Sequence, residues 1–191
     1  MDALEAIFTR RSIRAYTGQP IGEADLAEIL SAGLMAPSAE NFQPWYFVVI
    51  RSSEQMSRLI EVMGRVASEM EPHLRERFAS HPEVAADTAR FVRSLGGAPV
   101  CVLAFALKDN YAYPDTVLES ISAALENMLI AAASKGIGSC WLTTPRVAAA
   151  GAELRNVFAP GKGELAAIAT FGYAAKVPNA PKRKEGRIVI I

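Results

Sequence analysis

Residues 10–16 form a compact cluster of cationic side chains. Arg10, Arg11 and Arg14, together with the hydroxyl of Ser12, lie within a stretch of five residues. A guanidinium group presents a planar fork of donors that matches the oxygens of a phosphate, and a neighbouring hydroxyl adds another donor. The spacing therefore indicates a phosphate site. It is equally typical of a solvated basic helix end, which the helix dipole favours.

A second candidate segment, residues 36–45, reads Ala-Pro-Ser-Ala-Glu-Asn-Phe-Gln-Pro-Trp. The fixed φ angle of each proline makes the loop rigid, and the amides of Asn41 and Gln43 can both donate and accept hydrogen bonds. Such a set of groups suits the edge of a heteroaromatic ring. The same residues also fit an ordinary helix-to-strand turn that carries Trp45 into the core, and the loop taken alone favours that simpler interpretation.

Two further segments are candidates for ligand contacts. Leu142, Thr143 and Thr144 end a predicted strand, and the ends of strands are where α/β proteins often place ligands. The segment is not a dinucleotide fingerprint, because only two glycines occur in it and the helix comes before it. Lys182 and Arg183 belong to a second cationic cluster, which by default is a solvated tail.

The hydrophobic periodicity predicts the elements that must hold these segments. Helices are expected over residues 2–9, 23–35, 54–70, 83–95, 116–135 and about 147–158, and strands over 46–50, 100–107, 139–143 and 165–173. Residues 71–81 form a polar middle between two of these helices. The interleaving of more helix than strand indicates an α+β or mixed α/β layered domain.

Two of these stretches point to contacts beyond the local fold. Residues 116–135 combine a helical apolar repeat with many alanines, which predicts either a central core helix or a subunit interface. The tail, residues 174–191, ends in four aliphatic residues, Ile188 to Ile191. Exposed aliphatics at a terminus would normally fray, so we expect this segment to dock, for example as an added strand on a partner subunit.

The composition excludes several classes of protein. With 191 residues, 51% of them hydrophobic, the chain suits one domain over 1–191. The 20 basic and 20 acidic residues cancel, which argues against nucleic acid or an anionic membrane as a partner. Cys101 and Cys140 lie in apolar runs and are expected to be buried thiols, whereas His73 and His81 are expected on the surface. No Cys/His spacing indicates a metal site, and no secretory or membrane signal is evident, so we expect a cytoplasmic protein.

These segments together resemble the nitroreductase family of flavoproteins along nearly the whole chain. The similarity is carried by Arg-Arg-Ser-x-Arg-x-aromatic at 10–16, Ala-Pro-Ser-x-x-Asn-x-Gln-Pro-Trp at 36–45, Gly-x-Gly-Ser-Cys-Trp at 136–141, and Phe-Gly-Tyr at 171–173 with the basic tail. The resemblance implies an α+β nitroreductase-like fold, with a central mixed β-sheet flanked by helices. It also implies a homodimer in which the C-terminal segment extends onto the partner subunit and two FMN molecules lie at the interface.

The resemblance further implies roles for individual residues. Arg10 and Ser12 would hold the phosphate and the ribityl chain, and Lys182 or Arg183 would close on the phosphate from the tail. Arg14 would lie near the pyrimidine edge of the ring. The loop after the second helix would come from the other subunit, and the end of the third strand would line one ring face. The implied cofactor-binding residues are Arg10, Arg11, Ser12, Arg14, Pro37, Ser38, Ala39, Asn41, Gln43, Leu142, Thr143, Thr144, Lys182 and Arg183.

The implied function is an FMN-dependent NAD(P)H oxidoreductase. NADH or NADPH would supply electrons, and a small electron-poor acceptor, such as a nitroaromatic, a quinone or an enone, would be reduced by ping-pong hydride transfer. The flavin carries the chemistry, so no protein nucleophile, general base or metal is required. Residues 63–95 would cap the pocket, with Phe78 and Phe91 selecting the substrate by shape.

Several alternatives stay open on the sequence. One is a more specialised family chemistry, such as reductive dehalogenation or flavin fragmentation. Another is a flavin-binding module that stores or senses the cofactor without substantial turnover. A third is a protein whose basic clusters bind phosphorylated or nucleic-acid ligands, which the zero net charge and the few aromatics in the basic segments disfavour.

Overall fold

A computed structural model describes residues 1–107, 109, 115–147 and 149–191. Its elements, in chain order, are α1 (Ala3–Thr9), α2 (Glu23–Leu34), η1 (Ala39–Asn41), β1 (Trp45–Ile50), α3 (Ser53–Arg77), α4 (Pro82–Ser94), η2 (Leu95–Gly97), β2 (Val100–Ala106), α5 (Asp115–Ser134), β3 (Gly138–Leu142), α6 (Thr144–Val147), α7 (Gly151–Phe158) and β4 (Leu165–Gly172). The helix predicted over 147–158 is observed as α7, with the short α6 before it; residue 148 lies outside the described residues.

The strands β1 to β4 form one antiparallel sheet in the order β1-β2-β4-β3. Strands β2 and β3, which the single helix α5 joins, run parallel to each other but are separated by β4. We expected a mixed sheet. Among the described residues, every adjacent pair of named strands is antiparallel, because strands that run parallel, such as β2 and β3, are not adjacent. Parallel pairing is confined to an isolated bridge between Ser12 and Ser139. The α+β class is confirmed.

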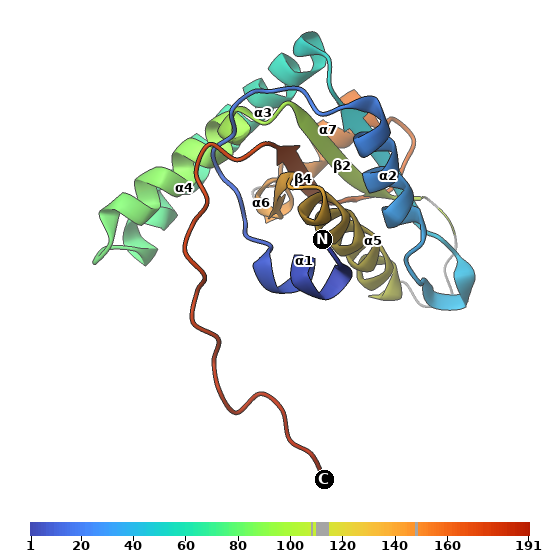
Figure 1. Ribbon diagram of the computed structural model, residues 1–191. Coiled ribbons are helices and arrows are strands. Elements are labelled where there is room, and N and C mark those ends of the chain that lie inside the picture. Colours follow the sequence, from blue (N-terminus) through green and yellow to red (C-terminus); the bar gives the residue numbers. More distant parts are fainter. Residues whose placement is uncertain (108, 110–114, 148) are drawn as a thin grey trace.

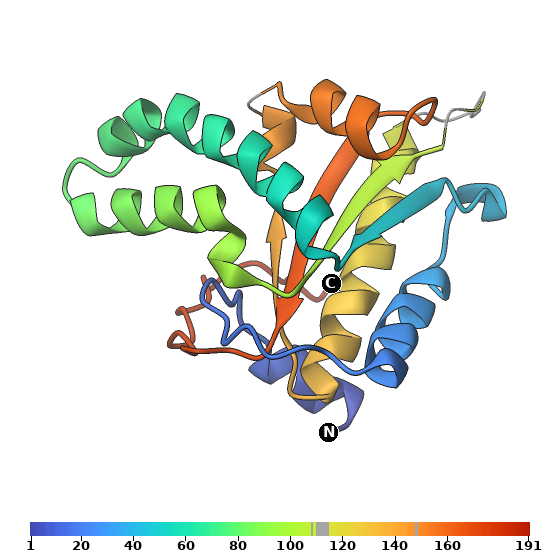
Figure 2. The same ribbon diagram turned by 90° about the horizontal axis from the view of Figure 1, so that it is seen from above.

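Helices cover both faces of this sheet (Figures 1 and 2). Helices α2 and α5 pack on one face, and α3, α4 and α7 pack on the other. Strand β4 is buried at every position, and β2 at all but its last. Both faces of these two strands are covered, so their sequences are apolar with little polar alternation, and Thr170 of β4 is a buried polar residue.

Helix α5 has seven buried residues, as expected for a central core helix, and the other possibility for this helix, a subunit interface, stays a prediction. It packs against α1, α2 and the sheet. At Gly33 of α2 a Cβ atom would come within 2.3 Å of the Met128 side chain, so the two helices approach as closely as a glycine allows. Within the described part of the chain, α5 alone has the length and mean hydropathy (1.3) of a membrane span, and here that apolar surface serves the core.

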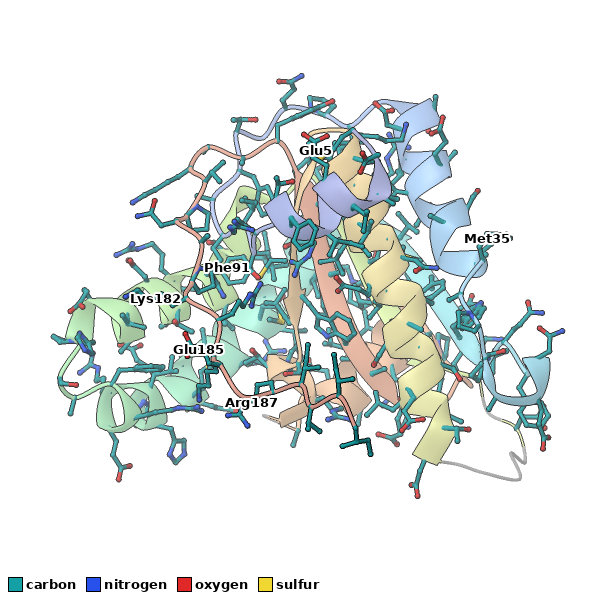
Figure 3. The ribbon with its side chains drawn as sticks, turned by 60° about the horizontal axis from the view of Figure 1, so that its bottom comes forward. Glu5, Met35, Phe91, Lys182, Glu185 and Arg187 are labelled. Atoms are coloured by element: carbon teal, nitrogen blue, oxygen red, sulfur yellow. The ribbon has the colours of Figure 1, made fainter. Side chains whose placement is uncertain are left out.

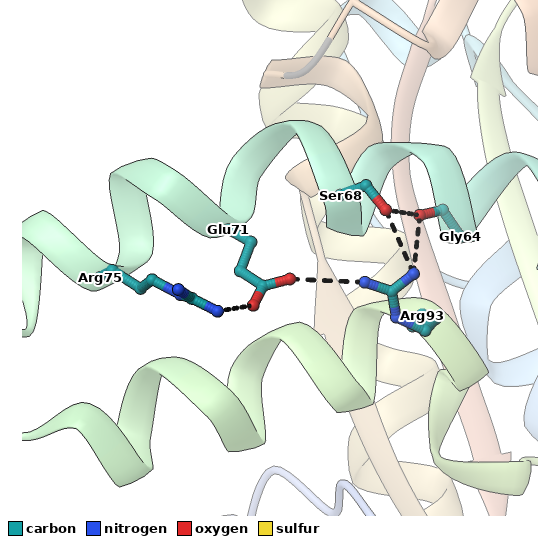
Figure 4. A network of polar contacts seen from close by, with 5 residues as sticks. All are labelled: Gly64, Ser68, Glu71, Arg75 and Arg93. Carbon is teal, nitrogen blue, oxygen red and sulfur yellow. Dashed lines mark hydrogen bonds and ion pairs between the residues drawn. The ribbon is translucent and has the colours of Figure 1, made fainter.

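Helices α3 and α4 form a long antiparallel hairpin that projects from the sheet (Figure 2). The first of these helices was expected to end at residue 70, before the polar middle at 71–81, but residues 71–77 continue α3. Charged pairs support these extra turns, since Glu71 lies 2.7 Å from Arg75 and 3.5 Å from Arg93 of α4 (Figure 4). Leu74 is buried against alanines of α4, so these turns also have a small apolar core.

The tail leaves the body of the molecule as an extended segment (Figure 1). Its start is anchored, because Ala175 N donates to Ala15 O at 2.9 Å and Ala174 forms a bridge with Tyr16. Residues 175–191 are all exposed, including the aliphatic residues 188–191. Contiguous exposed apolar side chains often mark interaction sites. The docking of this segment on a partner subunit stays a prediction.

Candidate functional site

The basic segment 10–16 runs along β3, an edge strand of the sheet. Helix α1 begins at the Asp2 cap, whose carboxylate accepts from Glu5 N at 2.8 Å, and it ends just before the segment. Ile13 N then donates to Ser139 O at 2.9 Å, and Ser12 bridges to the same residue. Two candidate segments that are more than a hundred residues apart in the sequence are therefore brought together.

Arg10 and Arg11 have different partners. Arg10 Nε lies 3.4 Å from a carboxylate oxygen of Glu126 on α5, a contact that does not use the two terminal guanidinium nitrogens. Arg11 Nη1 donates to the carbonyl oxygens of Phe8 and Arg10 at 2.9 and 2.8 Å, so Arg11 caps the end of α1. Arg10 is therefore the better candidate for binding a phosphate. Arg11 instead matches the alternative interpretation, a basic residue at a helix end.

A cavity of about 750 Å³ lies beside Arg14, within the size range of small-molecule sites. The guanidinium of Arg14 stacks on the ring of Phe91, 5.9 Å from its centroid, and Nη1 lies 3.5 Å from Ser12 O. Ser12 and Arg14 line one wall, whereas Phe78 and Phe91 of the α3–α4 hairpin line another. The side chains expected to bind the ring and those expected to select the substrate thus border one space.

Sequence reasoning missed part of this wall. Asp87 and Thr88 of α4, Gly96 after it, and Lys176 at the start of the tail also line the cavity. The amphipathic pattern of α4 shows which face is apolar, but it does not show what the polar face borders. The glycine pair at 96–97 was visible only as a break between elements, and Lys176 stands outside the basic cluster at 182–184.

Cys140 marks the point where the cationic side chains converge on β3. Burial raises the pKa of its thiol, while the charge of Arg14, a hydrogen bond with Ser12 and the charge of Arg10 act in the opposite direction. Burial alone raises the pKa of Cys101 to about 12. Both thiols are buried and unpaired, as predicted, and they stay protonated at neutral pH, so neither is a nucleophile. The two histidines are exposed, also as predicted.

The end of β3 follows directly on Cys140. Leu142 is buried and ends the strand, Thr143 is exposed, and Thr144 begins α6. Thr143 O accepts from Arg146 N at 3.1 Å, which fixes the turn between the two elements. The predicted ring-facing segment therefore continues the strand on which Arg10, Ser12 and Arg14 converge. Its contact with a ring stays a prediction.

The loop at 37–43 lies elsewhere. Figure 3 shows Met35, which leads into it, on the opposite side of α5 from Phe91 of α4, and Figure 1 agrees. The loop is anchored to α5, because Ala39 N donates to Ser120 Oγ at 3.3 Å. Within one chain the structure therefore does not bring this loop to the cavity beside Arg14.

The loop is nevertheless highly ordered by local contacts. Gln43 N donates to Ser38 Oγ at 3.0 Å, and Gln43 Nε2 donates to Asn41 Oδ1 at 3.1 Å. Glu40, Asn41 and Gln43 have φ angles of 50°, 56° and 47°, which L-residues rarely adopt. Strained backbone of this kind clusters at binding sites, where the surrounding contacts hold it in place.

The basic residues of the tail are also apart from the cavity. Lys182 and Arg183 are exposed on the extended segment, where Figure 3 labels Lys182. Neither residue is among those that line the cavity beside Arg14. Their closing on a phosphate, like the other implied ligand contacts, stays a prediction.

Comparisons with known proteins agree with this arrangement. The model of the nitroreductase family matches residues 7–173, so the chain belongs to the nitroreductase family. A protein named putative NADH dehydrogenase/NAD(P)H nitroreductase from Archaeoglobus fulgidus is 35% identical over 141 residues, covering 74% of this chain and 67% of that protein.

Two solved structures match the whole fold. A nitroreductase with bound FMN from Bacteroides fragilis has a TM-score of 0.79 at 27% identity, covering 100% of this chain and 99% of the other. A BluB-like flavoprotein from Clostridium difficile has a TM-score of 0.76 at 27% identity, with the same coverage. The predicted family and fold are thereby confirmed.

Proposed function

We propose that this protein is an FMN-dependent NAD(P)H oxidoreductase that reduces small electron-poor molecules, such as nitroaromatics, quinones or enones. The observation that carries the proposal is the position of the basic segment 10–16. It runs along β3, where Ile13 N donates to Ser139 O, and its Ser12 and Arg14 line a cavity of about 750 Å³. The FMN in the Bacteroides fragilis structure supports the choice of cofactor. The name of the Archaeoglobus fulgidus relative supports NADH or NADPH as the electron donor.

The residues of the site fit a phosphorylated flavin. The terminal nitrogens of Arg10 and the hydroxyl of Ser12 are suited to a phosphate and to ribityl hydroxyls. The cavity has an aromatic wall at Phe91 and a cation at Arg14, which suit a flat ring with a polar edge. Bound FMN would supply hydride chemistry, with the nicotinamide and then the acceptor reacting at the same ring in ping-pong order.

Arg14 is the residue that would tune this chemistry. A positive charge at the pyrimidine edge stabilises the negative charge that reduction places there. Because its guanidinium stacks on Phe91, the charge has a defined position without a carboxylate to neutralise it in that contact. Burial raises the pKa of the Tyr16 hydroxyl, as it does for the Cys140 thiol, so neither group is suited to act as a general base.

The proposed active form is a homodimer. The loop at 37–43 does not reach the cavity of its own chain, and the tail carries four exposed aliphatic residues. Helix α1 adds Leu4 and Phe8, which are 66% and 74% exposed. Two copies of the chain would cover these apolar surfaces, and each would supply its loop and tail to the cavity of the other.

The test is spectroscopic and then kinetic. The purified protein should show the visible absorption of an oxidised flavin and release FMN, not FAD, on denaturation. With NADH or NADPH it should reduce members of a panel of nitroaromatics, quinones and enones faster than free FMN does. A preparation that stays colourless after incubation with FMN contradicts the proposal.

The same panel separates the alternatives. Bound flavin without turnover above that of free FMN would favour a storage or sensing module. Consumption of the flavin itself, in place of the acceptor, would favour flavin fragmentation. Release of halide from a halogenated acceptor would favour reductive dehalogenation.

A further inference from the structure

We propose that Gly96 is a positioning residue, which fixes Arg14 at the place where its guanidinium meets the flavin; the inference rests on the proposed function. Gly96 lies in η2, between α4 and β2, with a φ of +66°. A Cβ atom on Gly96 would lie 2.5 Å from Arg14 O and 2.9 Å from Arg14 C. Both contacts are with backbone, which cannot rotate away, so a side chain at position 96 must push the Arg14 backbone and η2 apart.

Gly96 also binds the other end of the same short segment. Its carbonyl oxygen accepts from Tyr16 N at 2.9 Å. The glycine therefore touches the chain on both sides of Ala15, by van der Waals contact before it and by a hydrogen bond after it. This double contact holds the segment that carries Arg14 against the end of α4.

Two other glycines lie in close contact with residues on either side of Arg14. A Cβ atom on Gly138 of β3 would lie 2.6 Å from Ile13 Cγ1, and one on Gly172 of β4 would lie 2.9 Å from Tyr16 Cδ1. Of the three glycines, Gly96 is the one that meets the backbone of Arg14 itself. Gly138 and Gly172 meet side chains on either side of it.

The hydroxyl of Tyr16 completes this arrangement. It lies 2.9 Å from Ile13 O and 2.7 Å from Thr170 Oγ1, and Tyr16 is buried. A buried hydroxyl with two partners fixes the turn from Ile13 to Tyr16, since leaving either partner unpaired is costly. Arg14 is thus held between two fixed residues, and its own side chain is exposed toward the cavity.

A small displacement is expected to affect cofactor chemistry. The Arg14 carbonyl would have to move by about 0.9 Å to relieve the contact from 2.5 to 3.4 Å. A misplacement of about 1 Å can cost about a hundredfold in rate, because electrostatic stabilisation depends on preorganised geometry. The expected result is weaker FMN binding and less stabilisation of the reduced flavin.

The adjacent residue, Gly97, provides a matched control. Gly97 has a φ of +73°, but a Cβ atom there would have its nearest neighbour, Tyr16 O, at 4.0 Å. The variants Gly96→Ala and Gly97→Ala therefore impose the same kind of backbone strain, and only the first pushes on Arg14. The measurements are the FMN dissociation constant from quenching of flavin fluorescence, the midpoint potential of the bound flavin, and the thermal unfolding curve.

Gly96→Ala should weaken FMN binding by about tenfold or more and shift the midpoint potential to more negative values. Gly97→Ala should stay within about twofold of the wild type in binding, although both variants lose thermal stability. Equal FMN affinity and equal potential in the two variants would overturn the inference. If the wild type itself binds no FMN, the proposed function fails, which is a distinct outcome.

A milder variant covers the case in which Gly96→Ala does not fold. Tyr16→Phe keeps the ring but removes the hydroxyl bonds to Ile13 O and Thr170 Oγ1. It should weaken FMN binding by about threefold and shift the potential in the same direction, whereas Tyr173→Phe should not. Matching FMN affinity and potential in Tyr16→Phe and Tyr173→Phe would overturn the inference.

Discussion

The segment at 10–16 and the loop at 37–43 are both candidate flavin contacts, yet the protein holds them in opposite ways. The segment is held by backbone hydrogen bonds within its own chain, from Ile13 N to Ser139 O of β3 and from Tyr16 N to Gly96 O. The loop is anchored to α5 by Ala39, and the amide side chains of Asn41 and Gln43 bond to each other. One half of the site is thus completed by the chain itself, and the other half is presented outward.

The difference extends to backbone strain. Three consecutive or near-consecutive residues of the loop, 40, 41 and 43, have positive φ without being glycine. Each such residue costs about 1–3 kcal/mol, less for asparagine, and persists only where other contacts hold it. Residues 10–16 themselves have no positive φ angle, although Leu95 and Gly96, which pack beside them in η2, do. In the proposed homodimer, the second copy would use this outward-facing strained loop.

Of the changes that test this difference, removal of the end of the tail should have the largest effect, on dimer association. Deleting residues 186–191 removes the aliphatic side chains that we expect to dock on the partner. Burial of even two such side chains contributes about 3 kcal/mol, so dimer dissociation should become about a hundredfold easier. Sedimentation equilibrium measures this directly. An unaltered association constant in the truncated protein would show that residues 186–191 do not hold the dimer together.

Next in size is the effect of Arg10→Ala, with Arg11→Ala as its control. A charged hydrogen bond contributes about 1.5–3 kcal/mol, so loss of the Arg10 guanidinium should weaken FMN binding by about tenfold or more. Arg11 bonds to carbonyl oxygens at the end of α1, so its removal should lower the unfolding temperature with little change in FMN affinity. Equal FMN occupancy in Arg10→Ala and the wild type would remove the phosphate role.

The strain in the loop is tested by Glu40→Gly. Because Glu40 has a φ of 50°, glycine should relieve strain and raise the free energy of unfolding by about 1 kcal/mol. Glu69→Gly, at an exposed helical position of α3, should lower it by a similar amount. Chemical denaturation of both variants gives the comparison. A loss of stability in Glu40→Gly would mean that the loop is not strained.

The smallest effect is expected in the α3–α4 hairpin. Glu71 pairs with Arg75 and Arg93 at largely exposed positions, where ion pairs contribute about 0.2–1 kcal/mol (Figure 4). Glu71→Ala should therefore lower stability slightly, with less effect at high salt, and leave FMN affinity unchanged. A clear change in FMN affinity would mean that this ion-pair network also contributes to the FMN site.

Much of the fold was predictable from local patterns. The periodicity of residues 116–135 predicted the helix α5, as either a core helix or a subunit interface. The apolar run at 100–107 predicted β2 as a buried strand, and residues 165–173 were predicted as the strand β4. The prediction failed at residues 71–77, where a polar stretch stays helical. Glu71 pairs with Arg93 and Leu74 packs on α4, and neither contact with the neighbouring helix has a signature in the local sequence.

The sequence by itself determined which residues can do chemistry: the guanidinium groups at 10, 11 and 14, the amides of the loop, and the hydroxyls after β3. Only the tertiary structure decided their roles. It turned Arg11 into a helix cap, placed Arg14 over Phe91, and set Gly96 against the Arg14 backbone. Residue type fixes what a group can donate or accept, whereas contacts between distant segments fix its partner, and those depend on how the whole sheet and its helices pack.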